Sequence, residues 1–539
     1  MSIDSDVVQE TIEAQAHDPA AGATARATVQ PVTPALRKGF LLATACATCG
    51  LISLDTNIVA VSLPSIARSL HAGFADLEWV VSAYMVSFAS CLLPMGGIAD
   101  RYGRKKLMMF GLCLFSLASL GCGLAPSVAV LNISRAVKGI GASMLLTAAL
   151  AVIANAFPGP LERARAWAIW GMAMGITTTV APLVGGVITQ WAGWRWIFLL
   201  NLPVCAVLMM CTARAVPESR NPHALRTDFA GSVLFGTGLA FGIWALIGAQ
   251  DAGWQSAATA SRFAMCVLLI GAFVKVERRL AHAVIDLSLF MRARFVAAVL
   301  GMFGYAACAQ VMMTFLPLYL QNAFQWAPTR AGFGMLPFAV SMIVGPFLGA
   351  RLGRQLSGPT STLSLGLGLV GIGNLLTAAV APSAQYPYVA LAMIVTGLGA
   401  GVLNGDTQKA IMACVPPNRT GMASGISTTT RFTAIVTSVG VLGAVLASRT
   451  RVSIDSAMHC QKAGDACVDA RFMSDLLAGD LSHAFSRLAP DLQRALAPIA
   501  RAGFASGFAS ALTVAGFLAL AIAIAIRLLG GGRMSAAIR

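Results

Sequence analysis

Long apolar segments are the feature of this sequence that most limits its possible folds. A helix needs about 20 mostly apolar residues to cross a bilayer. Only 11% of the 539 residues are charged, compared with about 25% in a typical soluble domain. A chain with so few charges cannot solvate several soluble domains, so we predict an all-α polytopic membrane protein. Fourteen segments meet the length criterion, at 39–64, 77–98, 107–125, 128–157, 164–190, 195–213, 229–250, 260–276, 295–321, 331–350, 362–381, 386–413, 421–447 and 503–529.

The basic residues predict how these segments are oriented. Lys and Arg gather in alternate short loops, as in the clusters at 101–106 and 278–279, and such loops face the cytoplasm in membrane proteins. With an even number of spans, both termini are then expected in the cytoplasm. The same distribution explains the net charge of +16 without a nucleic-acid partner, because nucleic-acid binders present one continuous basic face.

Related turns in two parts of the chain indicate a duplicated architecture. The segments GGIADRYGRKK (96–106) and GARLGRQ (349–355) follow the second and the tenth predicted spans, and duplicated halves are typical of transporters. We therefore expect six spans, a two-span insertion and six further spans. The expected boundaries are a disordered cytoplasmic tail at 1–37, a six-helix bundle at 38–215, the two-helix insertion at 228–277, a second six-helix bundle at 294–530 and a cytoplasmic tail at 531–539.

A polar segment at 449–501 interrupts the second predicted bundle and is expected outside the membrane. Its part at 472–500 has apolar residues at helical spacing, which favours short helices that lie on the membrane or cap the outer mouth. Cys460 and Cys467 lie in this segment, where an oxidising compartment permits disulfides. The sequence leaves open whether they form a local disulfide or stay as two thiols.

Asp55 is a carboxylate inside the first predicted span. It lies sixteen residues from position 39. That is about 24 Å along a helix that rises 1.5 Å per residue, and hence past the midplane of a hydrocarbon core about 30 Å thick. A carboxylate there must pair with a cation, take up a proton or face water. Each outcome suits proton-coupled transport, and the alternative is a structural acid near the interface.

The fourth predicted span offers Asp55 a partner. Arg135 lies toward its outer third, and Lys138 follows one turn later on the same face. Gly139 and Gly141 lack side chains, so another helix can approach closely. If Arg135 stands near Asp55, it favours the ionised carboxylate, whereas burial favours the protonated one. Asp55 could then bind and release a proton as a cavity opens to either side. A fixed structural ion pair is the alternative.

The fifth predicted span contains a helix breaker. Pro182 cannot donate a backbone hydrogen bond and clashes with the carbonyl of Thr178, while Gly175, Gly185 and Gly186 give the helix a flat face. The segment is therefore a candidate hinge or seal, with ordinary small-residue packing as the alternative.

The second half carries further charges within predicted spans. Asp406 and Lys409 in the twelfth span can pair on one helix face, beside the polar Asn404 and Gln408. This group is a candidate for a second coupling site, a substrate contact or an inner gate. Arg431 in the thirteenth span is a further cation whose partner the sequence does not identify.

The sequence contains no motif of a metalloenzyme or an ATP-driven pump. Its six histidines are scattered, and it lacks H-E-x-x-H, a metal-spaced Cys/His set and a Walker-type glycine loop. We therefore expect no enzymatic activity, no metal and no cofactor.

Five motifs in chain order resemble those of the major facilitator superfamily, and in particular its fourteen-span drug:proton antiporters. LDTNIVAVSLP resembles the first-span motif with its acid at Asp55, and RAVKGIGA resembles the fourth-span motif R-x-x-Q-G-x-G-A with its arginine at Arg135. GITTTVAPLVGG is similar to the fifth-span antiporter motif, and ERRLAHAVIDLSLF is similar to the link after the eighth span. The signature loop G-x-x-x-D-R-x-G-R-K is matched by Gly97, Asp100, Arg101, Gly103, Arg104 and Lys105.

This resemblance covers about 38 to 530 and implies the major facilitator fold, with alternating access between two six-helix halves. It implies proton-coupled efflux of small amphipathic or cationic compounds across the bacterial inner membrane. Asp55, assisted by Arg135, would bind the proton, and Asp100, Arg101 and Arg104 would gate the cytoplasmic side. The expected partners are a small-molecule substrate, protons and the lipid bilayer. A monomer is expected. Whether the protein also works with a periplasmic adaptor and an outer-membrane channel is left open by the resemblance.

The sequence also departs from the family pattern. Lys138 stands where the family usually has Gln, Ala181 stands where it usually has Gly before the proline, and 349–355 lacks an acid equivalent to Asp100. The alternative functions are a dedicated exporter of one metabolite, such as a siderophore, an antibiotic or a lipid, and a membrane sensor that transports nothing. Substrate identity does not follow, because these motifs serve helix mechanics that broad and narrow exporters share.

Overall fold

The fold of the chain is all-helical. A computed structural model describes residues 35–220, 229–279, 287–353, 359–415, 420–457, 470–479, 484–485 and 490–531, and within these ranges it contains helices and turns but no strand. Thirteen of the described helices are long and apolar enough to cross a membrane. Helix α3 (Phe74–Tyr102), bent by 53° between Leu92 and Pro94, adds a fourteenth. The predicted fourteen-span fold is therefore confirmed.

The first part of the chain forms the first six predicted spans. The bend in α3 comes at Pro94, where the proline ring removes a backbone hydrogen bond. The sixth span is divided in two, a short helix and a longer one. The helices of this part are α2 (Ala35–Leu70), α3, α4 (Arg104–Gly123), α5 (Val128–Ala156), α6 (Pro160–Trp191), α7 (Trp196–Leu199) and α8 (Asn201–Ala215).

Two helices lie between the first and last parts of the chain. Helices α9 (Phe229–Ala252) and α10 (Ala257–Arg279) pack against each other. Helix α9 also contacts both α3 and α17 (Thr420–Ala457). The inserted pair therefore lies beside the place where the first and last parts meet.

The last part departs from the expected regular spans. The ninth span is interrupted by a π-helix, η3 (Tyr305–Gln310), and the tenth is divided in two. Helix α17 continues past residue 447 and α20 (Pro490–Gly531) begins before residue 503, so helix replaces both ends of the polar segment expected at 449–501. The elements are η2 (Leu287–Met291), α11 (Ala293–Gly304), η3, α12 (Met312–Asn322), α13 (Pro328–Gly334), α14 (Leu336–Gly353), α15 (Pro359–Val380), η4 (Ala381–Ser383), α16 (Tyr386–Met412), α17, α18 (Ala470–Ala478) and α20.

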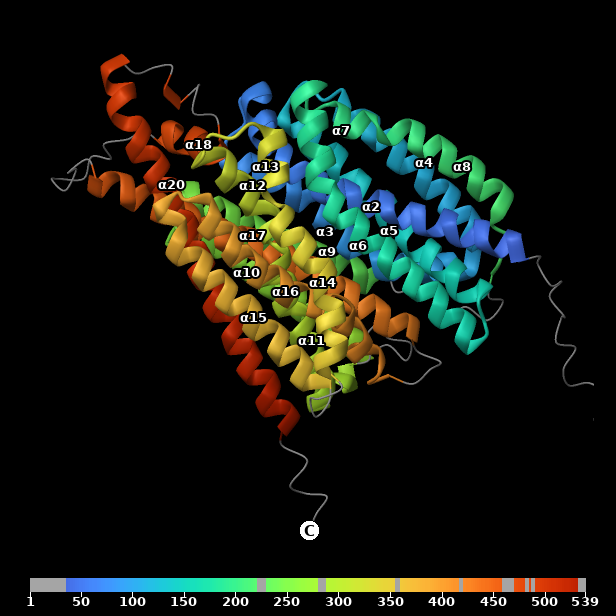
Figure 1. Cartoon of the computed structure of the whole chain (residues 1–539). Helices are drawn as coiled ribbons and strands as arrows, with labels where there is room; N and C mark the ends of the chain where they lie inside the picture. Colours follow the sequence, from blue (N-terminus) through green and yellow to red (C-terminus); the bar gives the residue numbers. More distant parts are fainter. Residues whose placement is uncertain are drawn as a thin grey trace, which may run out of the picture.

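The first and last parts are joined where α13 contacts α6 and where α18 contacts α2 and α3, and we call this the α18 end (Figure 1). Gln321 donates a hydrogen bond to the Val61 carbonyl at 2.9 Å, and Thr329 donates one to the Gly186 carbonyl at 3.1 Å. Helix α18 contacts α2 and α3. From this end the helices of the two parts diverge toward the opposite end, which carries the turn between α3 and α4 and which we call the Asp100 end (Figure 1).

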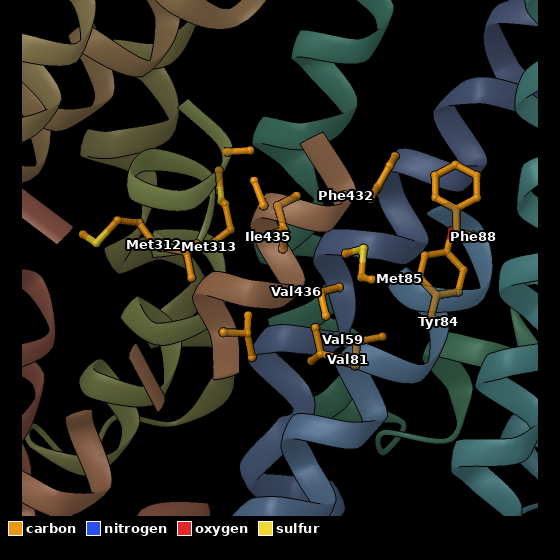
Figure 2. Close-up of a cluster of buried hydrophobic side chains, with 14 of the residues drawn as sticks. Val59, Val81, Tyr84, Met85, Phe88, Met312, Met313, Phe432, Ile435 and Val436 are labelled. Carbon is orange, nitrogen blue, oxygen red and sulfur yellow. The ribbon is translucent and has the colours of Figure 1, made fainter. Parts of the chain in front are cut away.

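An apolar cluster fills the space between the two parts. Figure 2 shows its side chains from α2, α3, α12 and α17 lying side by side. Phe88 of α3 packs edge-on against Phe432 of α17, with ring centroids 4.3 Å apart. Burial of large apolar side chains excludes water from this region. The labelled members of the cluster are Val59, Val81, Tyr84, Met85, Phe88, Met312, Met313, Phe432, Ile435 and Val436.

Candidate functional site

Asp55 lies on α2 and is fully buried, in contact with two cations from α5. Its Oδ2 lies 3.1 Å from Nη1 of Arg135, and its Oδ1 lies 2.5 Å from Nζ of Lys138. Asn201, at the start of α8, donates a third hydrogen bond to Oδ1 at 3.0 Å. All four side chains are at most 2% exposed. We call them the Asp55 cluster.

The two cations of this cluster are fixed by further contacts. Arg135 donates from Nε to the Val80 carbonyl at 2.9 Å, and its guanidinium lies 4.3 Å from the centre of the Tyr84 ring. The Lys138 ammonium lies between two rings, 4.7 Å from Phe115 and 4.9 Å from Phe198. An aromatic face attracts a cation, the more so when both are desolvated. The cluster is thus enclosed by side chains from α3, α4 and α7 as well.

Two glycines of α5 make this enclosure possible. A Cβ at Gly139 would overlap the Tyr84 carbonyl and the Ser87 hydroxyl of α3, and a Cβ at Gly141 would lie 3.0 Å from the Phe115 backbone of α4. Because these glycines have no side chain, α3 and α4 approach α5 closely on either side. That approach brings the rings of Tyr84 and Phe115 to Arg135 and Lys138.

The charges of the cluster do not balance. One carboxylate faces two cations, so the ionised cluster carries a net positive charge. A charge held away from water needs partners, and the loss of one partner from a buried pair is costly. Asp55 therefore holds two cations in place, and its charge state decides whether they stay paired.

The sequence predicted the meeting of Asp55 and Arg135 but only part of their surroundings. Lys138 departs from the family motif, and the sequence does not predict its bond to Asp55. Asn201 and Tyr84 were missed, although a polar Asn inside an apolar segment was a signal that a search for buried amides could have used. The structure brings these residues together; their role in proton coupling stays a prediction.

The signature loop forms the turn between α3 and α4. Arg104 donates from Nη2 to Oδ1 of Asp100 at 2.8 Å. Gly103 between them has a φ of +115°, a value that favours glycine. Glu218, which the sequence did not single out, accepts hydrogen bonds from the backbone N–H of Lys105 and of Lys106. A carboxylate at a helix N-terminus is stabilising, so Glu218 ties the segment after α8 to the start of α4.

The remaining loop residues lie near this turn. Arg101 is exposed, with its guanidinium 5.6 Å from the ring centre of Tyr102, and Gly97 lies partly buried within α3. Lys105 donates from Nζ to the Ala213 carbonyl at 2.6 Å. The contacts that the structure describes for this loop are with the first part of the chain, and its gating role stays a prediction.

The glycines predicted on α6 have different surroundings. A Cβ at Gly185 would overlap Ile58 of α2, and one at Gly186 would overlap Pro328 at the start of α13. A Cβ at Gly175 would meet nothing within 4 Å. Helix α6 runs continuously through Pro182. Gly185 and Gly186 therefore allow close packing at the α18 end, whereas a hinge at Pro182 stays a prediction.

The predicted group in the twelfth span is divided. Asp406 and Lys409 form an ion pair at 3.1 Å, but their side chains are 32% and 79% exposed. Exposed pairs contribute little stability. Asn404 lies apart from them, at a break in the helical backbone of α16 where its ψ is +32°. Its Oδ1 accepts a hydrogen bond from the Tyr305 hydroxyl at 3.1 Å. Gln408 is half-buried.

Arg431 has a partner that the sequence did not identify. Its Nε donates to Oε1 of Gln310, the last residue of the π-helix η3, at 2.6 Å. The predicted pair Cys460 and Cys467 lies outside the residues that the structure describes. No group of His, Cys, Asp or Glu that could hold a metal ion occurs among the described residues.

The fold and these motifs define a class of membrane transporter, and comparison with known proteins identifies the family. The chain belongs to the Major Facilitator Superfamily, whose sequence model matches residues 45–440. "Multidrug resistance protein Stp" of Mycobacterium tuberculosis is 33% identical over 432 residues, 79% of each chain. "Multidrug efflux pump LfrA" of Mycolicibacterium smegmatis is 29% identical over 478 residues, 88% of this chain and 93% of LfrA. "Methylenomycin A resistance protein" of Streptomyces coelicolor is 31% identical over 418 residues, 77% of this chain and 85% of the relative.

Solved structures agree with the fold. A bacterial homologue of the human lysosomal transporter Spinster, in an inward-facing and occupied conformation, matches with a TM-score of 0.65 and 16% identity, over 93% of this chain and 99% of that chain. The peptide transporter POT in complex with sulfate matches with a TM-score of 0.57 and 16% identity, over 91% of this chain and 95% of that chain. At this level of identity the likeness extends to the fold alone.

Proposed function

We propose that this protein is a proton-coupled exporter that moves small amphipathic compounds out of a bacterial cell across the inner membrane. The observation that carries the proposal is the Asp55 cluster, in which one fully buried carboxylate holds two cations. Intramembrane charges are rare and mark proton and substrate pathways. Relatives named as multidrug and drug resistance proteins support export of drug-like compounds.

The proton acts through Asp55. When Asp55 takes up a proton it loses its negative charge, and Arg135 and Lys138 both lose their ionic partner. The two cations keep their contacts with the Val80 carbonyl and the surrounding rings, so α2 is released from α5 while α5 stays bound to α3 and α4. Release of the proton restores both ion pairs. The proton thus biases the position of α2 within the first bundle.

Alternating access follows from the position of α3. Tyr84, the ring beneath Arg135, belongs to the helix that contacts α17 of the last part. A change at the Asp55 cluster therefore reaches the contact between the two halves, which we propose at 38–215 and 294–530. By the positive-inside rule, the Asp100 end faces the cytoplasm together with both termini, and the α18 end faces outward. With the α18 end joined, the protein is in an inward-facing state.

Inside-out membrane vesicles test this function. A panel of cationic, neutral and acidic amphipathic compounds is added after a pH gradient has formed, and the loss of the gradient is recorded. We expect compound-dependent proton movement for the wild type and its loss in Asp55→Asn. Glu162→Gln, a carboxylate-to-amide change in an exposed ion pair with Lys38, is the matched control and is expected to behave as the wild type does.

The outcomes separate the alternatives. Exchange by Asp55→Asn at the wild-type rate would show that proton coupling lies elsewhere. No compound-dependent proton movement by the wild type would favour a membrane sensor. A response to one compound alone would indicate a dedicated exporter. The assay is then repeated with purified protein in liposomes. This shows whether a monomer without a periplasmic adaptor exchanges the compound for protons.

A further inference from the structure

The second bundle contains a cation that the proton mechanism does not use. Arg431 lies in the first third of α17, half-buried, and among the described residues its only hydrogen bond goes to the neutral Gln310. No carboxylate of the described ranges lies within ion-pair distance of it. A guanidinium has five N–H donors, and this bond uses one. Arg431 therefore has unused capacity to bind an acceptor.

Charges elsewhere do not compensate Arg431. The carboxylate of Asp55 is already bound by Arg135 and Lys138. Glu78, a buried carboxylate of α3, faces Gly443 of α17, which lies twelve residues from Arg431, or about 18 Å along a helix. Asp406 is paired with Lys409. Among the ion pairs that the structure describes, Arg135 and Lys138 have a carboxylate partner and Arg431 has none.

Polar side chains from neighbouring helices bond to the π-helix η3, which carries the partner of Arg431. Gln310 ends the π-helix η3, and Tyr305, which begins it, donates to Asn404 at the break in α16. Ser438 of α17 donates to the Ala307 carbonyl of η3 at 2.6 Å, and Asn374 of α15 donates to the Cys308 carbonyl at 2.9 Å. The last two bonds satisfy carbonyls of the π-helix, a conformation that is often found at functional sites. The break in regular helix is therefore braced from three neighbouring helices.

Apolar side chains lie next to this polar group. Phe432, the residue after Arg431, faces Phe88 within the cluster of Figure 2, where Met312, Met313 and Ile435 also lie. Met side chains adapt to ligands of irregular shape. These side chains are buried in this structure. A molecule with an anionic group and an apolar body would match the available cation and, where these side chains rearrange, the apolar cluster beside it.

We propose that Arg431, with Gln310 beside it, binds an anionic group, most simply a carboxylate, of the compound that the protein exports. This proposal rests on the proposed function and narrows its substrate class to acidic amphipathic molecules. A guanidinium binds a carboxylate through two parallel hydrogen bonds. A cationic compound would be repelled by Arg431.

A chain of side-chain contacts connects Arg431 with the Asp55 cluster. Arg135 lies over Tyr84, Tyr84 stacks on Phe88 with centroids 5.9 Å apart, and Phe88 packs on Phe432 beside Arg431. Each step is a direct contact between side chains. Arg431 thus lies on α17, the helix of the last part that contacts α3 and, through Tyr84, the Asp55 cluster.

Three probes with one apolar body test the proposal: pyrenebutyrate, its neutral amide, and pyrenebutylamine. Their binding to the purified full-length protein is measured by fluorescence in detergent, without a proton gradient. We expect the wild type to bind pyrenebutyrate about tenfold to hundredfold more tightly than the amide, as charge-assisted hydrogen bonds allow, and to bind pyrenebutylamine most weakly. Arg431→Gln is expected to bind pyrenebutyrate and the amide equally.

Two further variants keep the test decisive. Arg431→Lys keeps the charge but loses the planar fork, so part of the preference is expected to remain. Arg262→Gln, at a cation that lies 4.3 Å from the ring centre of Trp244 in the inserted pair, is the matched control and should keep the full preference. Unchanged binding of the amide by Arg431→Gln reports that this variant is folded.

The results overturn the proposal in two ways. It is wrong if the wild type binds pyrenebutylamine as tightly as pyrenebutyrate, or if Arg431→Gln keeps the preference for pyrenebutyrate. Because binding is measured without a proton gradient, these outcomes are independent of the vesicle assay. Absence of compound-dependent proton movement there contradicts the proposed function instead.

Discussion

At the scale of single residues, the excess of positive charge around Asp55 sets what each substitution does. Lys138→Gln leaves the pair of Asp55 with Arg135 intact and removes the surplus charge. Asp55→Asn leaves two buried cations without a carboxylate, and removal of one partner from a buried ion pair costs about 3–5 kcal/mol. We therefore expect Asp55→Asn to lower the midpoint of thermal unfolding in detergent far more than Lys138→Gln does.

The double variant checks the physical reason. If the unpaired cations are what destabilises Asp55→Asn, then adding Lys138→Gln removes one of them and raises the midpoint again. Double-mutant cycles measure such coupling between residues in contact. Purely additive losses in the double variant would contradict the account of Asp55 as the shared partner of both cations.

Sequence patterns predicted some of these contacts because the patterns are local. An acid in an apolar span and a basic residue in another must find partners, so the pair of Asp55 and Arg135 could be predicted. The bond that Asn201 donates and the bonds that Glu218 accepts could not be predicted, since they depend on how segments distant in sequence meet. The partner of Arg431 was missed for the same reason: Gln310 reaches it only because η3 packs against α17.

At the scale of elements, the close approach of α5 to α3 depends on Gly139. We expect Gly139→Val to lower the midpoint of thermal unfolding, because the added side chain would meet the Tyr84 carbonyl. Overpacking costs about 1–3 kcal/mol. Gly171→Val on α6, where a Cβ meets nothing within 4 Å, is the matched control. Equal midpoints of thermal unfolding for the two variants would show that α3 and α5 can move apart at this contact without loss of stability.

The elements also show where helix prediction from sequence stops. Apolar length predicted the fourteen spans, because every backbone polar group in a bilayer must be satisfied within a helix. It did not predict the π-helix η3 or the break at Asn404. Both depend on bonds from other helices, such as that from Ser438 to Ala307, and those partners are distant in sequence.

At the scale of the whole molecule, hydrogen bonds at the α18 end hold the two parts together. Gln321 binds the Val61 carbonyl and Thr329 binds the Gly186 carbonyl across the contact. A neutral hydrogen bond contributes about 1 kcal/mol. Removing both with Gln321→Ala and Thr329→Val would then shift the equilibrium between the two ends about 30-fold, since about 1.4 kcal/mol corresponds to a factor of ten.

The direction of this shift follows from alternating access. Weakening the α18 end favours the state in which that end opens and the Asp100 end closes. One probe is attached at each of the exposed positions 106 and 409, which lie in the first and the last part. The distance between the two probes, measured in liposomes, reports how far apart the two parts are at the Asp100 end. The double variant is expected to gain a population with a shorter distance between the two probes.

Ser383→Ala, which removes an exposed hydrogen bond to the Val380 carbonyl within the last part, is the matched control and should leave the distribution of distances unchanged. If the double variant also leaves it unchanged, other contacts hold the α18 end closed, such as the bonds of Arg68 to the Gly479 carbonyl and of the Phe74 N–H to the Ser474 hydroxyl, or the apolar cluster of Figure 2.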